Sequence, residues 1–171
     1  MNILVCIKQV PDTTEIKIDP VKHTLIREGV PSIVNPFDAC ALEMAVRLKE
    51  KEGGKVVVIS MGPAQAKNAL KECLAVGADQ AFLVTDRAFG GSDTLATSYI
   101  LSRAIAAVET KTGEKFDLIF CGKQAIDGDT AQVGPEIAEH MDLPHVTLAT
   151  AVEMQMESFM LQETRTKDMI W

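Results

Sequence analysis

Several patterns that would place the chain in a common class are missing from its sequence. Its four cysteines, at positions 6, 40, 73 and 121, form no C-x-x-C pair, which argues against a disulfide framework or a zinc site. Lysines and arginines form no basic cluster in a chain of net charge −7, so a nucleic-acid surface is not indicated. No apolar run is long enough to cross a bilayer, and residues 1–7 are too short for a signal peptide. We therefore expect a cytoplasmic protein without a membrane span.

Catalytic and phosphate-binding motifs are also scarce. The three histidines, His23, His140 and His145, show no pairing with a nucleophile, and no cysteine has the local signature of a catalytic thiol. Neither G-x-x-x-x-G-K-[ST] nor G-x-G-x-x-G follows the first apolar run. We expect no catalytic residue and no metal site. A nucleotide held by backbone amides is the ligand that such a chain suits best.

Apolar runs and helical patterns alternate along an otherwise ordinary globular composition, 47% hydrophobic and 24% charged. Strands are expected at 3–7, 55–60, 81–84, 116–120 and 145–148, with the first central and the third at or near an edge. A small hairpin is expected within 16–26. The alternation predicts an α/β fold, a doubly wound and mainly parallel five-stranded sheet with helices on both faces.

Four helices are expected between these strands. The first begins at Pro36 with Asn35 as N-cap and ends at Gly53, and the second follows Pro63 and ends at Gly77. The third runs from 94 to about 108, capped by Ser92 or Asp93, and the fourth includes 136–141. In the third helix we expect Leu95, Ile100, Leu101 and Ile105 to face inward.

The segment from Gly122 to Val133 is the most informative stretch. It joins the expected strand at 116–120 to the last helix, and it is longer than most strand-to-helix loops. Glycine, aspartate and threonine also suit an ordinary turn, so that alternative stays open. In a binding loop, backbone N–H groups and a helix N-terminus would face an anion. Its mixed charge, with Lys123 expected to face Asp127 and Asp129, indicates hydroxyls or a base edge as partners of these carboxylates.

The blocks VCIKQVPD from Val5, NPFD from Asn35, GPAQA from Gly62, AVGAD from Ala75 and, above all, GKQAIDGD from Gly122 resemble the β subunit of electron transfer flavoproteins. This resemblance covers residues 1 to about 150. It implies an adenine-nucleotide α-hydrolase-like fold with strand order 3-2-1-4-5. It also implies a heterodimer with an α subunit that carries the redox-active FAD.

The resemblance further implies a bound nucleotide in this subunit, either AMP or, in electron-bifurcating members, a second FAD. Electrons would pass between acyl-CoA dehydrogenases of fatty acid oxidation, or other dehydrogenases, and a quinone reductase or ferredoxin. Gly128 and Thr130 replace bulkier or more acidic residues of AMP-binding relatives, which favours a diphosphate and hence FAD. The matched nucleotide contacts are Cys6, Asn35, Pro36, Phe37, Asp38, Met61, Gly122, Lys123, Gln124, Ala125, Ile126, Asp127, Gly128, Asp129, Thr130, Ala131, Gln132 and Val133.

Asn35 has two interpretations at this stage, a simple helix cap or a ligand contact. The end of the chain also departs from the resemblance. Residues 1–150 are expected to form the nucleotide-binding domain, and 151–171 to begin a partner-binding arm that diverges near its end. That divergence indicates either a truncated chain or a frame change, and it leaves open whether the chain still binds the α subunit.

Two other functions stay open as lesser alternatives. A stand-alone adenine-nucleotide regulator of the universal-stress type would have a glycine-rich loop where this chain has GKQAID from Gly122. An ATP pyrophosphatase would have its phosphate loop after the first strand, where KQVPD stands from Lys8.

Overall fold

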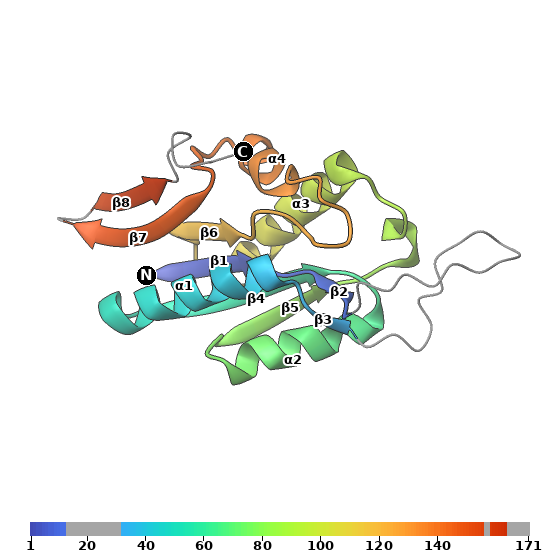
Figure 1. The fold of residues 1–171 in the computed structure, drawn as a ribbon, viewed down its shortest axis with the longest axis horizontal. Helices are drawn as coiled ribbons and strands as arrows, with labels where there is room; N and C mark the ends of the chain where they lie inside the picture. Colours follow the sequence, from blue (N-terminus) through green and yellow to red (C-terminus); the bar gives the residue numbers. More distant parts are fainter. Residues whose placement is uncertain (13–31, 156–157, 164–171) are drawn as a thin grey trace, which may run out of the picture.

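A computed structural model of the chain describes residues 1–12, 32–155 and 158–163 and contains a four-stranded parallel sheet (Figure 1). The strands are β1 (Asn2–Cys6), β4 (Lys55–Met61), β5 (Gln80–Val84) and β6 (Leu118–Cys121), in the order β5-β4-β1-β6. The structure confirms that the first strand, β1, is central and that it pairs with β6, the strand before the long loop. It also confirms that the third predicted strand, β5, lies at an edge.

Helices cover both faces of this sheet, which confirms the predicted doubly wound α/β class. The helices α1 (Pro36–Glu52) and α2 (Lys67–Ala75) pack on the face that carries Ile3 and Val5. On the opposite face, α3 (Thr94–Thr112) and α4 (Val133–His140) pack against Leu4 and Ile59. Because β1 is buried on both faces, its sequence is apolar at every position from Ile3 to Cys6.

The predicted ends of the first helix are confirmed. Asn35 occupies the N-cap position, Pro36 is the first helical residue and Gly53 follows the last turn with φ 76°. Gly54 must also be glycine, because a Cβ there would overlap the Met1 carbonyl oxygen. The cap of α3 is Asp93, whose side chain accepts a hydrogen bond from the Ala96 N–H.

The predicted fifth strand is wrong. Residues 145–148 form no strand, and Leu148 has φ 55°, a left-handed conformation that a strand cannot contain. A strand begins only at β7 (Ala149–Gln155), which pairs antiparallel with β8 (Ser158–Glu163) in a separate two-stranded sheet. Val152 packs against the core cluster beneath α1.

Other boundaries differ by a few residues. In α3, Leu101 and Ile105 are buried and Ile100 partly so, but Leu95 is 61% exposed, contrary to the prediction. The last helix, α4, begins at Val133 and ends at His140. Short 3-10 helices, η1 (Ala64–Ala66) and η2 (Arg87–Phe89), precede α2 and α3.

A second two-stranded sheet is formed by residues that lie between β1 and α1 in the sequence. The strands β2 (Gln9–Pro11) and β3 (Ser32–Val34) pair antiparallel, with Pro11 opposite Ser32 at the end of the ladder. The hairpin predicted within 16–26 falls outside the described residues, as does the end of the tail from 164. Within the described part of the chain, no helix is both long and apolar enough to cross a bilayer.

Candidate functional site

The carboxyl ends of β1 and β6 are neighbours, and the chain leaves them toward opposite faces of the sheet. Cys6 at the end of β1 pairs in register with Cys121 at the end of β6. From β1 the chain continues to α1 on one face, and from β6 it continues through residues 122–132 to α4 on the other (Figure 1). Such a reversal is where ligands bind in open α/β sheets. All predicted contacts lie on these segments except Met61, which ends the neighbouring strand β4.

Asp38, in the first turn of α1, joins the two strand ends through one buried carboxylate. Its Oδ2 accepts a hydrogen bond from the Lys8 N–H at 2.7 Å, just beyond β1, and the carboxylate also accepts from the Gly122 N–H, just beyond β6. Burial raises the pKa of Asp38 from 3.8 to about 6, although these hydrogen bonds and one from the Asn35 side chain act in the opposite direction. The group therefore titrates close to neutral pH.

Gly122 allows this close approach. A Cβ at position 122 would overlap an Asp38 carboxylate oxygen, and it would lie 2.7 Å from both the Asp38 nitrogen and the Phe37 carbonyl carbon. Two of these atoms are backbone, so a larger residue could be fitted only by moving α1 or β6. The glycine that opens the loop is thus required by packing against α1.

Asn35 fastens the loop to the start of α1. Its side chain is fully buried, donates from Nδ2 to the Gln124 carbonyl at 2.8 Å and accepts at Oδ1 from the Ile126 N–H at 3.2 Å. The side chain makes no capping hydrogen bond to α1, so the simple cap interpretation is wrong for the side chain. The backbone of Asn35 still occupies the cap position, and its carbonyl accepts from the N–H groups of Asp38 and Ala39.

The loop itself is held by short-range and long-range polar contacts. Lys8 Nζ lies 2.6 Å from Asp127 Oδ1, and Gln124 Nε2 donates to Asp129 Oδ1 at 2.6 Å. No ion pair of the described residues joins Lys123 to either carboxylate, and the lysine that pairs with Asp127 is Lys8. The sequence analysis did not identify Lys8 as the partner of Asp127. Its position directly after the first strand was the available signal.

Backbone conformation turns the second half of the loop toward α4. Asp129 and Ala131 have φ of 54° and 55°, which is uncommon outside glycine. Gln132 follows with helical dihedral angles and precedes Val133, the first residue of α4. A left-handed residue followed by a right-handed one, as at Ala131 and Gln132, turns successive N–H groups to one side, an arrangement that suits an anion. The same stretch leads into the N-terminus of α4, where the N–H groups of Val133 and Gly134 have no partner within the helix and Pro135 has no N–H.

The remaining predicted contacts lie at the same edge. Cys6 is buried and Met61 partly so, and both pack in the cluster beneath α3 and α4. Cys6 and Cys121 are free thiols. The pKa of Cys6 is well above its usual value, chiefly because of a hydrogen bond with Cys121 and then because of burial. Pro36 and Phe37 begin α1 beside Gly122.

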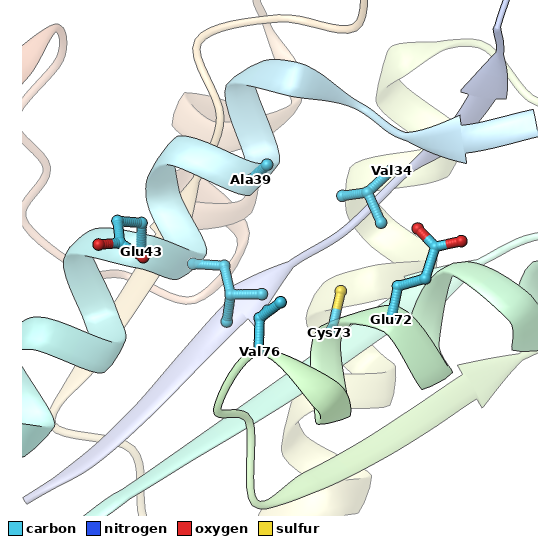
Figure 2. A pocket seen from close by; sticks show the side chains of 7 residues that line it. Val34, Ala39, Glu43, Glu72, Cys73 and Val76 are labelled. Atoms are coloured by element: carbon cyan, nitrogen blue, oxygen red, sulfur yellow. The ribbon is translucent and has the colours of Figure 1, made fainter.

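A separate hollow of about 290 Å³ lies between α1 and α2 (Figure 2). Figure 2 shows Ala39 and Glu43 on α1 across from Cys73 and Glu72 on α2. Its lining is otherwise apolar, and it includes none of the predicted nucleotide contacts. Two carboxylates at an apolar hollow disfavour an anionic ligand there. Within the described residues, no group of three or more His, Cys, Asp or Glu side chains could hold a metal ion.

Comparison with known proteins gives a consistent result. Residues 22–168 match the family model described as the electron transfer flavoprotein domain. The chain is 60% identical over 162 residues to electron transfer flavoprotein subunit beta of Thermoanaerobacterium thermosaccharolyticum, an alignment covering 95% of this chain and 60% of the relative. It is 56% identical over 165 residues to the subunit of the same name from Megasphaera elsdenii, covering 95% and 61%.

A third relative is named for a complex. The caffeyl-CoA reductase-Etf complex subunit CarD of Acetobacterium woodii is 56% identical over 156 residues, covering 91% of this chain and 58% of the relative. The chain thus spans about 60% of the length of the curated relatives that it matches.

Proposed function

The chain belongs to the electron transfer flavoprotein domain family, and on that premise we propose that it binds an adenine-containing nucleotide, AMP or FAD, between the carboxyl ends of β1 and β6. The observation that carries this proposal is the attachment of the loop to α1. Asn35 and Asp38 hold residues 122–126 by side-chain hydrogen bonds to their backbone. A loop whose path is fixed by buried polar groups is preorganised to bind a ligand.

The donors of the second half of the loop suit the anionic part of a nucleotide. The N–H groups around Ala131 and Gln132 and those at the start of α4 would hold the phosphate. Asp127 and Asp129, each already paired with a donor on one oxygen, retain acceptor capacity for ribose hydroxyls. Cys6 and Met61 would supply an apolar wall beside them.

AMP and FAD differ in what they supply. Bound FAD would accept and release electrons, whereas AMP would have a structural role. The exposed stretch from Gly128 to Ala131 includes Gly128, whose missing Cβ leaves open space, and this favours the larger diphosphate of FAD.

We assign the chain the role of the β subunit of an electron transfer flavoprotein, paired with an FAD-binding α subunit. In this role it would help to shuttle electrons between acyl-CoA or other dehydrogenases and an acceptor. The names of its relatives support this assignment, including the one called a subunit of a caffeyl-CoA reductase-Etf complex. Residues 151–171 would begin the partner-binding arm.

Co-expression with an α subunit from the same source tests the proposal. The complex is purified by a tag on this chain and denatured, and every released nucleotide is identified by chromatography. AMP together with one FAD per heterodimer would assign AMP to this subunit, whereas two FAD would assign it the second flavin. Recovery of no nucleotide, with or without the α subunit, would contradict the proposal.

A matched pair of variants locates the site. Asp129→Ala removes a loop carboxylate, and Glu139→Ala removes an exposed carboxylate of α4 outside the loop. We expect Asp129→Ala to lower nucleotide occupancy with little change in melting temperature, and Glu139→Ala to leave both unchanged. Equal occupancy in the two variants would remove Asp129 from the site.

A further inference from the structure

Cys6 and Cys121 bring two free thiols together at the last paired position of β1 and β6. Both side chains lie on the sheet face covered by α3 and α4, since both pack in the cluster that includes Leu101 and Ile137. The neighbouring Cys121 thiol is the main cause of the raised pKa of Cys6. The other two cysteines are elsewhere, with Cys40 exposed on α1 and Cys73 buried beneath the opposite face.

The register of β1 and β6 meets two of the geometric conditions for a disulfide, the spacing of the Cα atoms and the direction of the side chains. Neighbouring strands lie about 4.8 Å apart, and disulfides join residues whose Cα atoms are about 4.4–6.8 Å apart. Since successive side chains of a strand alternate between faces, two residues paired in register point to the same side. Cys6 and Cys121 therefore need no change of strand register to form a bond.

We propose that Cys6 and Cys121 are an oxidation-sensitive pair that forms an intrachain disulfide at the base of the nucleotide loop when the protein meets a hydroperoxide. The Cys121 sulfur attacks one oxygen of the peroxide and becomes a sulfenic acid; the O–O bond breaks, and the other oxygen takes up a proton and leaves as an alcohol or water. The Cys6 thiol then attacks the sulfenic sulfur, loses its proton and releases water. Two thiols and one peroxide thus give one disulfide, one alcohol and one water.

Exposure sets the order of these two steps. Cys121 is partly exposed whereas Cys6 is buried, so Cys121 is the thiol that a peroxide reaches first. Cys6 is buried beside it, and its raised pKa keeps it protonated and unreactive toward solvent oxidants. Its role is therefore to resolve the sulfenic acid formed next to it.

The bond would change the start of α4. Gly134 is packed so closely on Cys121 that a Cβ there would lie 3.2 Å from the Cys121 Cβ and 3.6 Å from its Sγ. A disulfide draws the sulfurs to about 2.05 Å, so the Cys121 side chain shifts within this tight contact with the first turn of α4. Since that turn and the residues before it carry the proposed phosphate donors, we expect the oxidised form to bind nucleotide several-fold more weakly. This consequence, but not the disulfide itself, rests on the proposed function.

Peptide mapping of the intact complex with its α subunit tests the pair. The complex is treated with increasing hydrogen peroxide, alkylated, digested without reduction and analysed by mass spectrometry. The expected product is one linked peptide containing Cys6 and Cys121, lighter by two hydrogen atoms than the separate peptides and released by dithiothreitol. AMP affinity is measured by calorimetry before oxidation, after it and after reduction.

Two variants keep the outcomes apart. Cys121→Ser should give no linked peptide and no peroxide-dependent change in affinity, whereas Cys40→Ser should respond as the wild type does. Recovery of Cys6 and Cys121 only as separate alkylated or sulfinic peptides would overturn the proposal. A linked peptide with unchanged AMP affinity would overturn its effect on the site. A linked peptide in a protein that never binds AMP or FAD would contradict the proposed function while confirming the disulfide.

Discussion

Substituting alanine for Gly122 should show how much the close packing of the loop's first residue against α1 contributes to stability. The added Cβ would overlap an Asp38 carboxylate oxygen and lie 2.7 Å from two backbone atoms of α1. Gly128→Ala is the matched control in the same loop, since a Cβ there meets nothing within 4 Å. Neither glycine has a positive φ, so the two changes differ only in the space available.

The expected destabilisation can be divided into two parts. Overpacking of a tightly packed site typically costs about 1–3 kcal/mol. Moving β6 away from α1 also breaks the hydrogen bond from the Gly122 N–H to the Asp38 carboxylate, and hydrogen bonds to charged groups contribute about 1.5–3 kcal/mol. Both costs arise from the same movement of β6 away from α1, so they are not independent. We therefore expect the free energy of unfolding to fall by about 3–5 kcal/mol rather than by the full sum of the two costs.

Thermal and urea unfolding followed by circular dichroism provide the assay. A loss of this size should lower the melting temperature by roughly 6–20 °C, because 1 kcal/mol corresponds to about 2–4 °C in a chain of this size. Gly128→Ala should unfold within about 2 °C of the wild type, as surface substitutions usually change stability by less than 0.5 kcal/mol. If the two variants unfold at the same temperature, the close approach of Gly122 to α1 does not contribute as described.

Three further changes probe the same edge. Asn35→Ala removes both side-chain bonds to the loop, and we expect nucleotide affinity to fall by more than the melting temperature indicates; equal stability loss with unchanged affinity would assign Asn35 a purely structural role. Because the folded pKa of Asp38 is raised from 3.8 to about 6, the unfolded chain releases this proton first, so stability should decrease by up to about 3 kcal/mol between pH 4 and pH 6. Urea midpoints should therefore fall less over this range in Asp38→Asn, and parallel pH profiles would contradict the assignment. Lys8→Gln removes an exposed ion pair with Asp127, so stability should change by less than about 1 kcal/mol while AMP affinity loses part of its salt dependence, as calorimetry in low and high salt would show.

Much of the fold could be predicted because its signals are local. The uninterrupted apolar residues of β1 indicate a strand covered on both faces, and the structure buries it in the centre of the sheet. The start of α1 at Asn35 and Pro36 and its end at Gly53 follow from cap chemistry alone. Such features depend on residues within one turn of each other, so the sequence displays them directly.

Two predictions of secondary structure and burial were wrong, the strand at 145–148 and the inward position of Leu95. Val146 and Leu148 have strand-forming side chains, but both are 43% exposed, and the left-handed backbone of Leu148 ends any extended run. In α3, Ser98 and Ser102 occupy the buried face because their hydroxyls donate to carbonyls of their own helix, at Leu95 and Tyr99. Polar residues therefore faced inward, and hydrophobic periodicity assigned Leu95 to the wrong side.

For the candidate site, the sequence located the loop but not the contacts that fix it. The hydrogen bonds of Asn35 reach residues about 90 positions away, and no local pattern encodes such a pairing. Position relative to the first strand was the only signal for Lys8. The resemblance to a known family identified the segments that converge at the edge, whereas their connections required the structure.

The carboxylate of Asp38 links residues that are remote in the chain, because its backbone partners follow β1 and β6 on either side of it. Formation of the loop therefore requires that α1, β1 and β6 have already assembled, so the site should appear and disappear with cooperative folding of the sheet. A ligand that binds only the assembled state stabilises it by about 2.7 kcal/mol at one hundred times its dissociation constant. Occupancy of the crevice would then protect amides throughout the central sheet from hydrogen exchange, far from any atom that touches the ligand.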